Sequence, residues 1–181
     1  MIASFKIAVV SLSAALAACS KRGHDGPPLA DTGVIITVPN QLPTCKNLGT
    51  CEDACRLGSA ADCLTAANSY STGTDAGLDE ARAASLLDAA CSLRSGSGCN
   101  LAGRMYEFGH GVPVDAAKAL SMYERSCKLD YMGGCYNVAV LNEAGRGTPK
   151  DLAKAAAMYR AVCAAGSQAS CDAATRLDPP K

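Results

Sequence analysis

The sequence predicts an all-α protein, a right-handed α/α solenoid of about three and a half helix-turn-helix repeats of 36 residues. Three observations lead to this fold: a cysteine spacing that recurs every 36 residues, glycines at matching places in each unit, and apolar side chains at helical spacing. A fixed period of this length is typical of stacked repeats, in which each unit buries its apolar face against its neighbours.

The cysteines define the period. Four Cys-x7-Cys pairs start 36 residues apart without insertion or deletion: Cys55 and Cys63, Cys91 and Cys99, Cys127 and Cys135, and Cys163 and Cys171. Each intervening segment is long enough only for a helix end, a tight turn and a helix start. Two antiparallel helices joined so closely can bring the paired Cα atoms within the roughly 4.4–6.8 Å that a disulfide requires. We therefore expect one disulfide per repeat.

Zinc binding is the competing interpretation of the cysteines. Structural zinc sites use cysteines about two to four residues apart, usually with a second such pair or with histidines nearby. This chain has only two histidines, His24 and His110, and its seven-residue gaps fit a zinc site badly. Disulfides are favoured, and no metal or other cofactor is expected.

The first 18 residues are predicted to be a lipoprotein signal peptide. Residues 7–18 form an apolar run that is too short to span a bilayer, which needs about 20 residues. The run leads into Leu16-Ala17-Ala18-Cys19, which resembles a bacterial lipobox, whose cysteine is lipidated. Ordinary cleavage after Ala17 is the alternative. Lipidation is favoured because Cys19 is the odd cysteine among eleven once the other ten are paired.

Residues 19–43 are predicted to be a lipid-anchored flexible tether, because glycines and prolines recur along them and prevent a long helix. The run from Val34 to Val38 inside this segment is β-prone. It can add to a partner as an edge strand, although packing on its own domain or staying loose is the commoner behaviour. His24 also lies here, with no partner in register, so a ligand role is not expected.

Residues 44–181 are predicted to form the repeat domain. Thr44–Leu57 takes the place of a preceding second helix and is expected to act as an N-terminal cap, with Cys45 and Cys51 as its staple, although other pairings of these two stay open. The remaining helices are expected near residues 60–71, 79–92, 97–108, 115–128, 133–144, 151–164 and 168–177. The last of them is a half repeat that covers the final apolar face.

The second helix of each unit shows the clearest pattern. Apolar side chains follow at intervals of four, three and four residues: Ala116, Leu120, Tyr123 and Cys127, and again Leu152, Ala156, Tyr159 and Cys163. An aspartate stands just before each of these helices, where an N-cap stabilises by about 1 kcal/mol: Asp79, Asp115 and Asp151. The glycines upstream supply the positive φ angles with which the first helix ends.

These residues resemble a known family. Gly109, Gly111-Val112, the Asp115-x-x-Lys118-Ala119 that follows and the small residues before Tyr106 are similar to Sel-one-like repeats, α/α relatives of the tetratricopeptide repeat. The cysteines stand where the ordinary repeat has paired alanines, and this variant resembles the Helicobacter-type cysteine-rich proteins, which are exported solenoids with one disulfide per repeat. The resemblance covers residues 51–177. It departs from the family at Asn142, at Thr148 and in the first turn, residues 72–78.

The resemblance implies one enzymatic alternative, because some cysteine-rich proteins of this class are associated with penicillin binding and slow β-lactam hydrolysis. The residues give this β-lactamase-like activity no independent support. The motifs of serine β-lactamases, serine hydrolases, zinc proteases and phosphate-binding loops are missing. Glu107 and Glu143 lie a full repeat apart, which indicates a solvated helix face and not an acid–base pair. His110 is expected to be an ordinary surface residue.

We expect instead a lipid-anchored envelope scaffold, most consistent with the outer membrane because Ser20 follows Cys19. Its successive first helices line one face of the solenoid, which is expected to bind an envelope protein, a peptide or a peptidoglycan-related ligand. The candidate surface side chains are expected to be exposed: Asn68, Asn100, Arg104, Tyr136 and Asn137. The alternative is that these are ordinary solvated positions. Nucleic acid is not an expected partner, because 17 basic residues are balanced by 17 acidic ones without a basic cluster.

Overall fold

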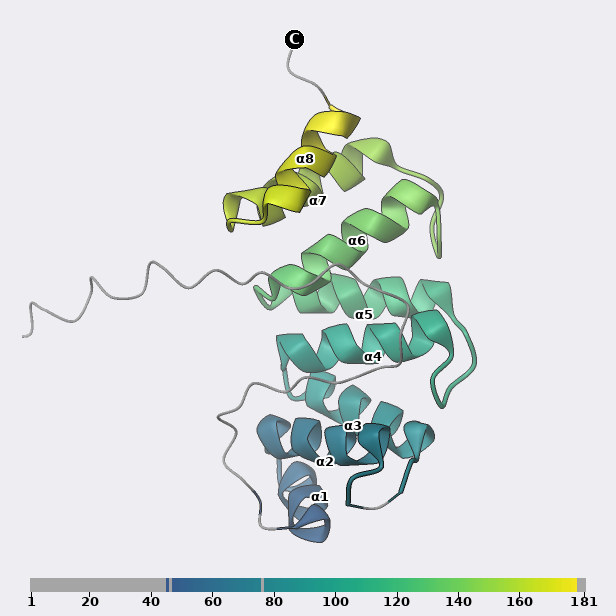
Figure 1. Cartoon of the computed structure of the whole chain (residues 1–181), viewed down its shortest axis with the longest axis vertical. Coiled ribbons are helices and arrows are strands. Elements are labelled where there is room, and N and C mark those ends of the chain that lie inside the picture. The colour runs from purple at the N-terminus through teal and green to yellow at the C-terminus, as the bar shows by residue number, and fades with distance from the viewer. Residues whose placement is uncertain (1–44, 46, 76, 179–181) are drawn as a thin grey trace, which may run out of the picture.

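The computed structural model describes residues 45, 47–75 and 77–178, which form eight helices stacked in one elongated array (Figure 1). The helices are α1 (Leu48–Arg56), α2 (Ala60–Thr72), α3 (Glu80–Ser92), α4 (Gly96–Phe108), α5 (Ala116–Lys128), α6 (Met132–Ala144), α7 (Leu152–Ala164) and α8 (Gln168–Leu177). The predicted α/α solenoid is confirmed. From α2 onward every helix begins and ends within one residue of its expected range. The predicted signal peptide and tether, including Cys19, His24 and residues 34–38, lie outside the described residues.

The first helices of the units are α2, α4, α6 and α8, and the second helices are α1, α3, α5 and α7. Each second helix from α3 to α7 begins with its aspartate cap, whose side chain accepts from the backbone N–H three residues later. Each first helix from α2 to α6 ends at a left-handed glycine: Gly73, Gly109 and Gly145. These caps fix the helix ends and hence the register of the repeat.

The second glycine of each turn has a different task, which is close packing against the preceding unit. Gly147 has a φ of +70°, and a Cβ at this position would overlap the carbonyl oxygen of Ala116 and lie 2.5 Å from its carbonyl carbon. A Cβ at Gly111 would overlap the backbone of Glu80 and Ala81 in the same way. The turn of one unit therefore lies against the start of the previous second helix, and only glycine fits there.

This packing explains why the first unit departs from the family pattern. Asp75 stands at the place of Gly111 and Gly147. The second helix that would lie beneath it is α1, which begins at Leu48, four residues later in the repeat than α3. Because α1 lacks that first turn, an open pocket lined in part by Cys45, Leu48 and Gly49 lies beside Asp75, so a side chain fits there and a glycine is not required.

The described residues contain five disulfides, of which four join neighbouring helices. In the four repeat units, each bridge links the end of a second helix to the following first helix, with Cα atoms 4.3–4.7 Å apart. The fifth joins Cys45 to Cys51 at the N-terminal cap, with a Cα separation of 5.1 Å. The predicted arrangement of one disulfide per repeat is confirmed, and the paired sulfurs are not free to act as zinc ligands.

The apolar core runs between the units in three clusters. The first is built around Leu87 and Met105, the second around Tyr123 and Leu141, and the third around Tyr159. Many other core positions are alanines, which let the helices approach closely but bury little area. Among the helices of the described residues, none is long and apolar enough to cross a membrane.

Candidate interaction surface

The first-helix face, formed by α2, α4, α6 and α8, holds the five side chains singled out in the sequence, but it does not expose all of them. Asn100 and Asn137 are buried, with 9% and 4% of their surface accessible. The Asn137 side-chain amide donates to Asn100 Oδ1 over 2.8 Å. The expectation that these two residues are exposed is therefore wrong, because α4 and α6 contact each other directly and enclose the pair.

Arg104 lies on the same face of α4, one turn after Asn100, and it is half-buried and not exposed as expected. Its Nε is shielded from solvent and has no hydrogen-bond partner. None of its guanidinium nitrogens forms an ion pair with a carboxylate of the described residues. An enclosed donor without an acceptor is costly, by about 1–3 kcal/mol. Among the described residues, Arg104 is therefore the charged side chain of this face that lacks a hydrogen-bond partner for an enclosed atom.

Tyr136 and Asn68 occupy the remaining positions. Tyr136 is half-buried, and its ring packs edge-on against Tyr159 of α7 with centroids 5.7 Å apart. Asn68 is half-buried near the end of α2. Tyr136 thus belongs partly to the core, so its expected full exposure is wrong. The polar part of the surface consists of Arg104 flanked by the enclosed asparagine pair, with Asn68 one repeat away.

The repeated glutamates on the first helices are not a solvated face, which corrects the expectation from sequence. The Glu107 side chain is only 5% exposed; it accepts from the Tyr123 hydroxyl (2.6 Å) and pairs with Arg146 (2.7 Å). Glu143 repeats the pattern one unit later with Tyr159 (3.0 Å) and Arg176 (2.8 Å). Each glutamate thus ties its first helix to the second helix and to the unit that follows.

These contacts change the acidity of the tyrosines. Burial, and then the neighbouring Glu107, raise the pKa of Tyr123 far above its ordinary value. Burial and the hydrogen bond to Glu143 likewise raise the pKa of Tyr159. Both hydroxyls therefore stay protonated at physiological pH and act as hydrogen-bond donors. Their role is structural.

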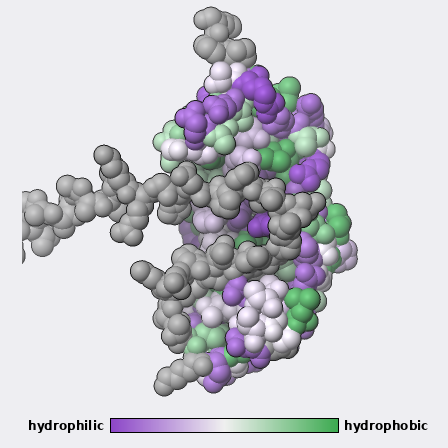
Figure 2. Space-filling view, viewed as in Figure 1, coloured by the Kyte–Doolittle hydropathy of each residue, from purple (hydrophilic) through white to green (hydrophobic). Residues whose placement is uncertain are grey.

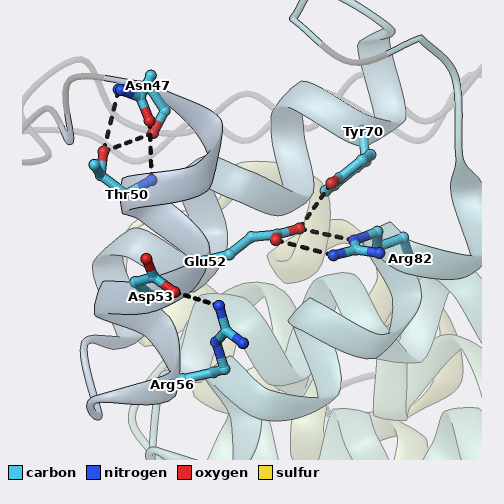
Figure 3. A network of polar contacts seen from close by, with 7 residues as sticks. All are labelled: Asn47, Thr50, Glu52, Asp53, Arg56, Tyr70 and Arg82. Carbon is cyan, nitrogen blue, oxygen red and sulfur yellow. Dashed lines mark hydrogen bonds and ion pairs between the residues drawn. The ribbon is translucent and has the colours of Figure 1, made fainter.

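A second row of polar contacts joins the second helices. In Figure 3, Glu52 of α1 accepts from the Tyr70 hydroxyl (2.7 Å) and pairs with Arg82 of α3 (2.7 Å). The hydrogen bonds from Arg82 and Tyr70 lower the pKa of the Glu52 carboxyl. The same figure shows the N-cap of α1, where Asn47 and Thr50 bond reciprocally, and the contact between Asp53 and Arg56.

The next unit keeps the tyrosine–carboxylate hydrogen bond of this row but lacks the ion pair. The Tyr106 hydroxyl donates to Asp88 Oδ2 (2.6 Å), while the buried Asp88 Oδ1 has no partner. Lys118 lies 3.9 Å above the centre of the Tyr106 ring and does not form an ion pair with Asp88. In the third unit Glu124 pairs with Lys154 (2.9 Å). Aspartate is one methylene shorter than glutamate, which accounts for the missing pair.

Glu107 and Glu143 recur at 36 residues, as do Tyr123 and Tyr159, whereas their arginine partners Arg146 and Arg176 are 30 residues apart. His110, expected on the surface, is half-buried, and its Nδ1 lies 3.2 Å from Glu80 Oε1. Together the two rows and the disulfides hold every described unit to its neighbours. The first-helix face is consequently a stiff platform, suited to recognition of a partner without rearrangement.

Comparison with known proteins supports this description of the repeats. A family model described as Sel1 repeat matches residues 97–131 and 133–167, which hold most of α4 and α5 and of α6 and α7. The resemblance inferred from the glycines, cysteines and aspartate caps is confirmed for these units. A search of curated proteins gives no match.

Several solved structures share the fold. Helicobacter pylori cysteine rich protein B is 29% identical, with a TM-score of 0.54, over 69% of this chain and 90% of that protein. A Sel1 repeat protein from Oxalobacter formigenes is 21% identical, with a TM-score of 0.66, over 72% of this chain and 38% of that one. A protective antigen present in uropathogenic Escherichia coli strains, displaying an SLR fold, is 22% identical, with a TM-score of 0.65, over 71% of this chain and 28% of that one.

The last two similarities concern the fold alone, and this chain spans well under half of either protein. The similarity to the Helicobacter protein extends over most of both chains. Five disulfides are present here, and disulfides persist in oxidising compartments outside the cytoplasm. The cysteine usage and this similarity together indicate an extracytoplasmic protein.

Proposed function

We propose that this chain is a scaffold that binds a protein or peptide of the bacterial cell envelope through its first-helix face, because residues 97–131 and 133–167 match the Sel1 repeat model. Stacked α/α repeats present an extended surface to which several units contribute. The chain suits this role because each unit is held to the next by a disulfide and by polar rows, so little conformational freedom is lost on binding.

The observation that carries the proposal is the incomplete hydrogen bonding of Arg104. Its guanidinium lies on the first-helix face with a shielded, unpartnered Nε, beside the closed Asn100–Asn137 pair. The two terminal nitrogens of the same guanidinium are not enclosed and form no ion pair with the described residues, so a carboxylate or a backbone carbonyl of a partner can accept from them. Arginine hydrogen bonds to such groups are worth about 1.5–3 kcal/mol, which is roughly ten- to a hundredfold in affinity.

The scaffold is further proposed to be attached to the membrane through lipid on Cys19. In this proposal residues 1–18 are the signal peptide, residues 19–43 the tether and residues 44–181 the binding domain. Ser20 after the cysteine favours the outer membrane. Labelling with a fatty-acid analogue is expected to mark the wild type and not Cys19→Ser. An unlabelled wild type whose mature chain begins at Ala18 would contradict lipidation.

Capture from detergent-solubilised envelope extract tests the binding function. The Arg104→Gln variant is expected to retain its helical signal and to capture the partner about ten- to a hundredfold less well. The matched control is Arg160→Gln, which removes an exposed arginine from α7, a second helix, and is expected to capture normally. Equal capture by both variants would contradict a role of the first-helix face.

Two further arms of the experiment address the other ligand classes. Capture that survives protease treatment of the extract but is lost after digestion of peptidoglycan would make the ligand a wall component. Saturable hydrolysis of the chromogenic β-lactam nitrocefin, abolished by one substitution, would replace the scaffold by an enzyme, since residues that act as a catalytic unit fail together.

A further inference from the structure

The two long edges of the solenoid are chemically different. The four connections spanned by the repeat disulfides lie along one edge, at the left in Figure 1. We call this the staple edge and define it as residues 56–59, 92–95, 128–131 and 164–167. The glycine-containing turns lie along the opposite side. This turn edge comprises residues 73–75, 77–79, 109–115 and 145–151.

A leucine recurs at one position of the staple edge. Leu57, Leu93 and Leu129 follow one another at intervals of 36 residues, each at the C-cap of a second helix. Leu57 is 89% exposed and Leu93 38%, and the nearby Tyr131 is also 38% exposed. Leu129 is half-buried. The exposed apolar side chains of the staple edge are therefore Leu57, Leu93 and Tyr131.

Apolar exposure alone does not single out this edge. Leu78 and Val114 on the turn edge are 70% and 68% exposed, and hydrophobic residues are visible along that side in Figure 2. The difference lies in charge. The turn edge has four acidic and two basic side chains: Asp75, Asp79, Asp115, Asp151, Arg146 and Lys150.

The staple edge has the opposite balance. It carries three basic side chains, Arg56, Arg94 and Lys128, and a single acidic one, Asp130. Arg56 pairs with Asp53 of its own helix. Arg94 and Lys128 are exposed and form no ion pair with any of the described residues. Because the whole chain has no net formal charge, this positive balance comes from the distribution of the charges.

We propose that the staple edge docks on an anionic phospholipid surface. Exposed leucines flanked by free cations suit the membrane interface, where apolar side chains enter the boundary between headgroups and acyl chains. Tyrosine is favoured at the same depth. Each Lys or Arg near an anionic leaflet contributes about 1 kcal/mol, which is roughly fivefold in partitioning. The acidic turn edge is repelled by the same surface and faces away from it.

This docking requires neither lipid on Cys19 nor the first-helix face, so it stands or fails separately from the proposed function. Its consequence is an orientation. The long axis of the solenoid lies along the membrane, and the first-helix face remains open to a partner. The disulfides add to this because three of the four repeat bridges hold a leucine-bearing connection in one conformation.

Single-tryptophan reporters in the full chain test the docking, since the sequence contains no tryptophan. Leu57→Trp places the reporter on the staple edge, and Leu78→Trp places a matched reporter on the turn edge. Both variants are mixed with vesicles of phosphatidylcholine and phosphatidylglycerol whose acyl chains are brominated. Residues 1–44 are the same in both, so attachment through them brings both reporters equally to the vesicle. Quenching and a blue shift are expected for Leu57→Trp alone.

The charge dependence gives the second readout. Adding Arg94→Gln and Lys128→Gln to Leu57→Trp is expected to lower the apparent partition coefficient about 25-fold. Arg104→Gln is expected to leave it unchanged. Equal quenching of the two reporters, or no quenching of Leu57→Trp, would overturn the proposal. So would a blue shift that grows with protein concentration without vesicles, because the staple edge would then be an interface between copies of the chain.

Discussion

The Gly147→Ala substitution tests how the units are held together. The added methyl group would meet three backbone atoms of the preceding second helix: the carbonyl oxygen and carbon of Ala116 and the amide nitrogen of Ala117, the last at 2.8 Å. Backbone atoms cannot swing aside as a side chain can. The turn must therefore move away from α5, and the contact between successive units opens.

The expected loss has two parts. Alanine at a φ of +70° costs about 1–2 kcal/mol, and overpacking against a fixed neighbour costs about 1–3 kcal/mol more. Together they amount to about 2–5 kcal/mol of unfolding free energy. For a domain of this size that corresponds to a melting temperature lower by roughly 6–20 °C.

Gly77→Ala is the matched control, because Gly77 has a φ of +74° but no atom within 4 Å of its added Cβ. It carries the backbone strain without the steric overlap, so a loss of about 1–2 kcal/mol is expected. Urea denaturation followed by far-UV circular dichroism, with the disulfides intact, measures both variants. Equal losses for Gly147→Ala and Gly77→Ala would refute the close packing of the turn against α5.

Three further predictions concern the polar rows. Tyr123→Phe removes a buried hydrogen bond to Glu107 and is expected to lower the unfolding free energy by about 1.5–3 kcal/mol in urea titrations, while Tyr131→Phe, whose ring is exposed, should change it little. Asp88→Glu restores the length found at the equivalent positions and is expected to raise the stability by up to about 1 kcal/mol; no gain would mean that the pair with the lysine cannot form. Because the pKa of Glu52 is lowered in the folded protein, its contribution is present above its ordinary pKa of 4.5 and is lost as the pH falls through the folded value. Arg82→Gln is therefore expected to flatten the acid side of the stability profile, and an unchanged profile would contradict that pairing.

Much of the fold is predictable from sequence because cysteines, glycines and aspartates all recur with the same period of 36 residues. The 36-residue recurrence places the disulfides, and the aspartate caps and glycines fix the helix ends. The reason for Asp75 was not predictable in this way. It depends on α1 starting a turn later than the other second helices, which the cysteine spacing does not report.

The surface was less predictable because exposure depends on how the units turn relative to one another. Position within a repeat correctly placed Asn100 and Asn137 on the first-helix face, but the approach of α4 to α6 buries them. Glu107 was misjudged for a related reason. Its arginine partner lies 39 residues further along the chain, in the next turn, so no local spacing within the helix indicates the pair.

The short range of the bridges also bears on how the chain is oxidised. Eight cysteines admit about a hundred different sets of pairs. From Cys91 onward each repeat cysteine has its partner only eight residues away, whereas the next nearest cysteine is 28 residues away. In these units the partner thiol is thus at a higher effective concentration than any other. Cys55 differs, because Cys51 lies only four residues from it. The native pairs of these units can form one after another while the chain is being exported. A disulfide isomerase is then little needed to correct pairs between distant cysteines.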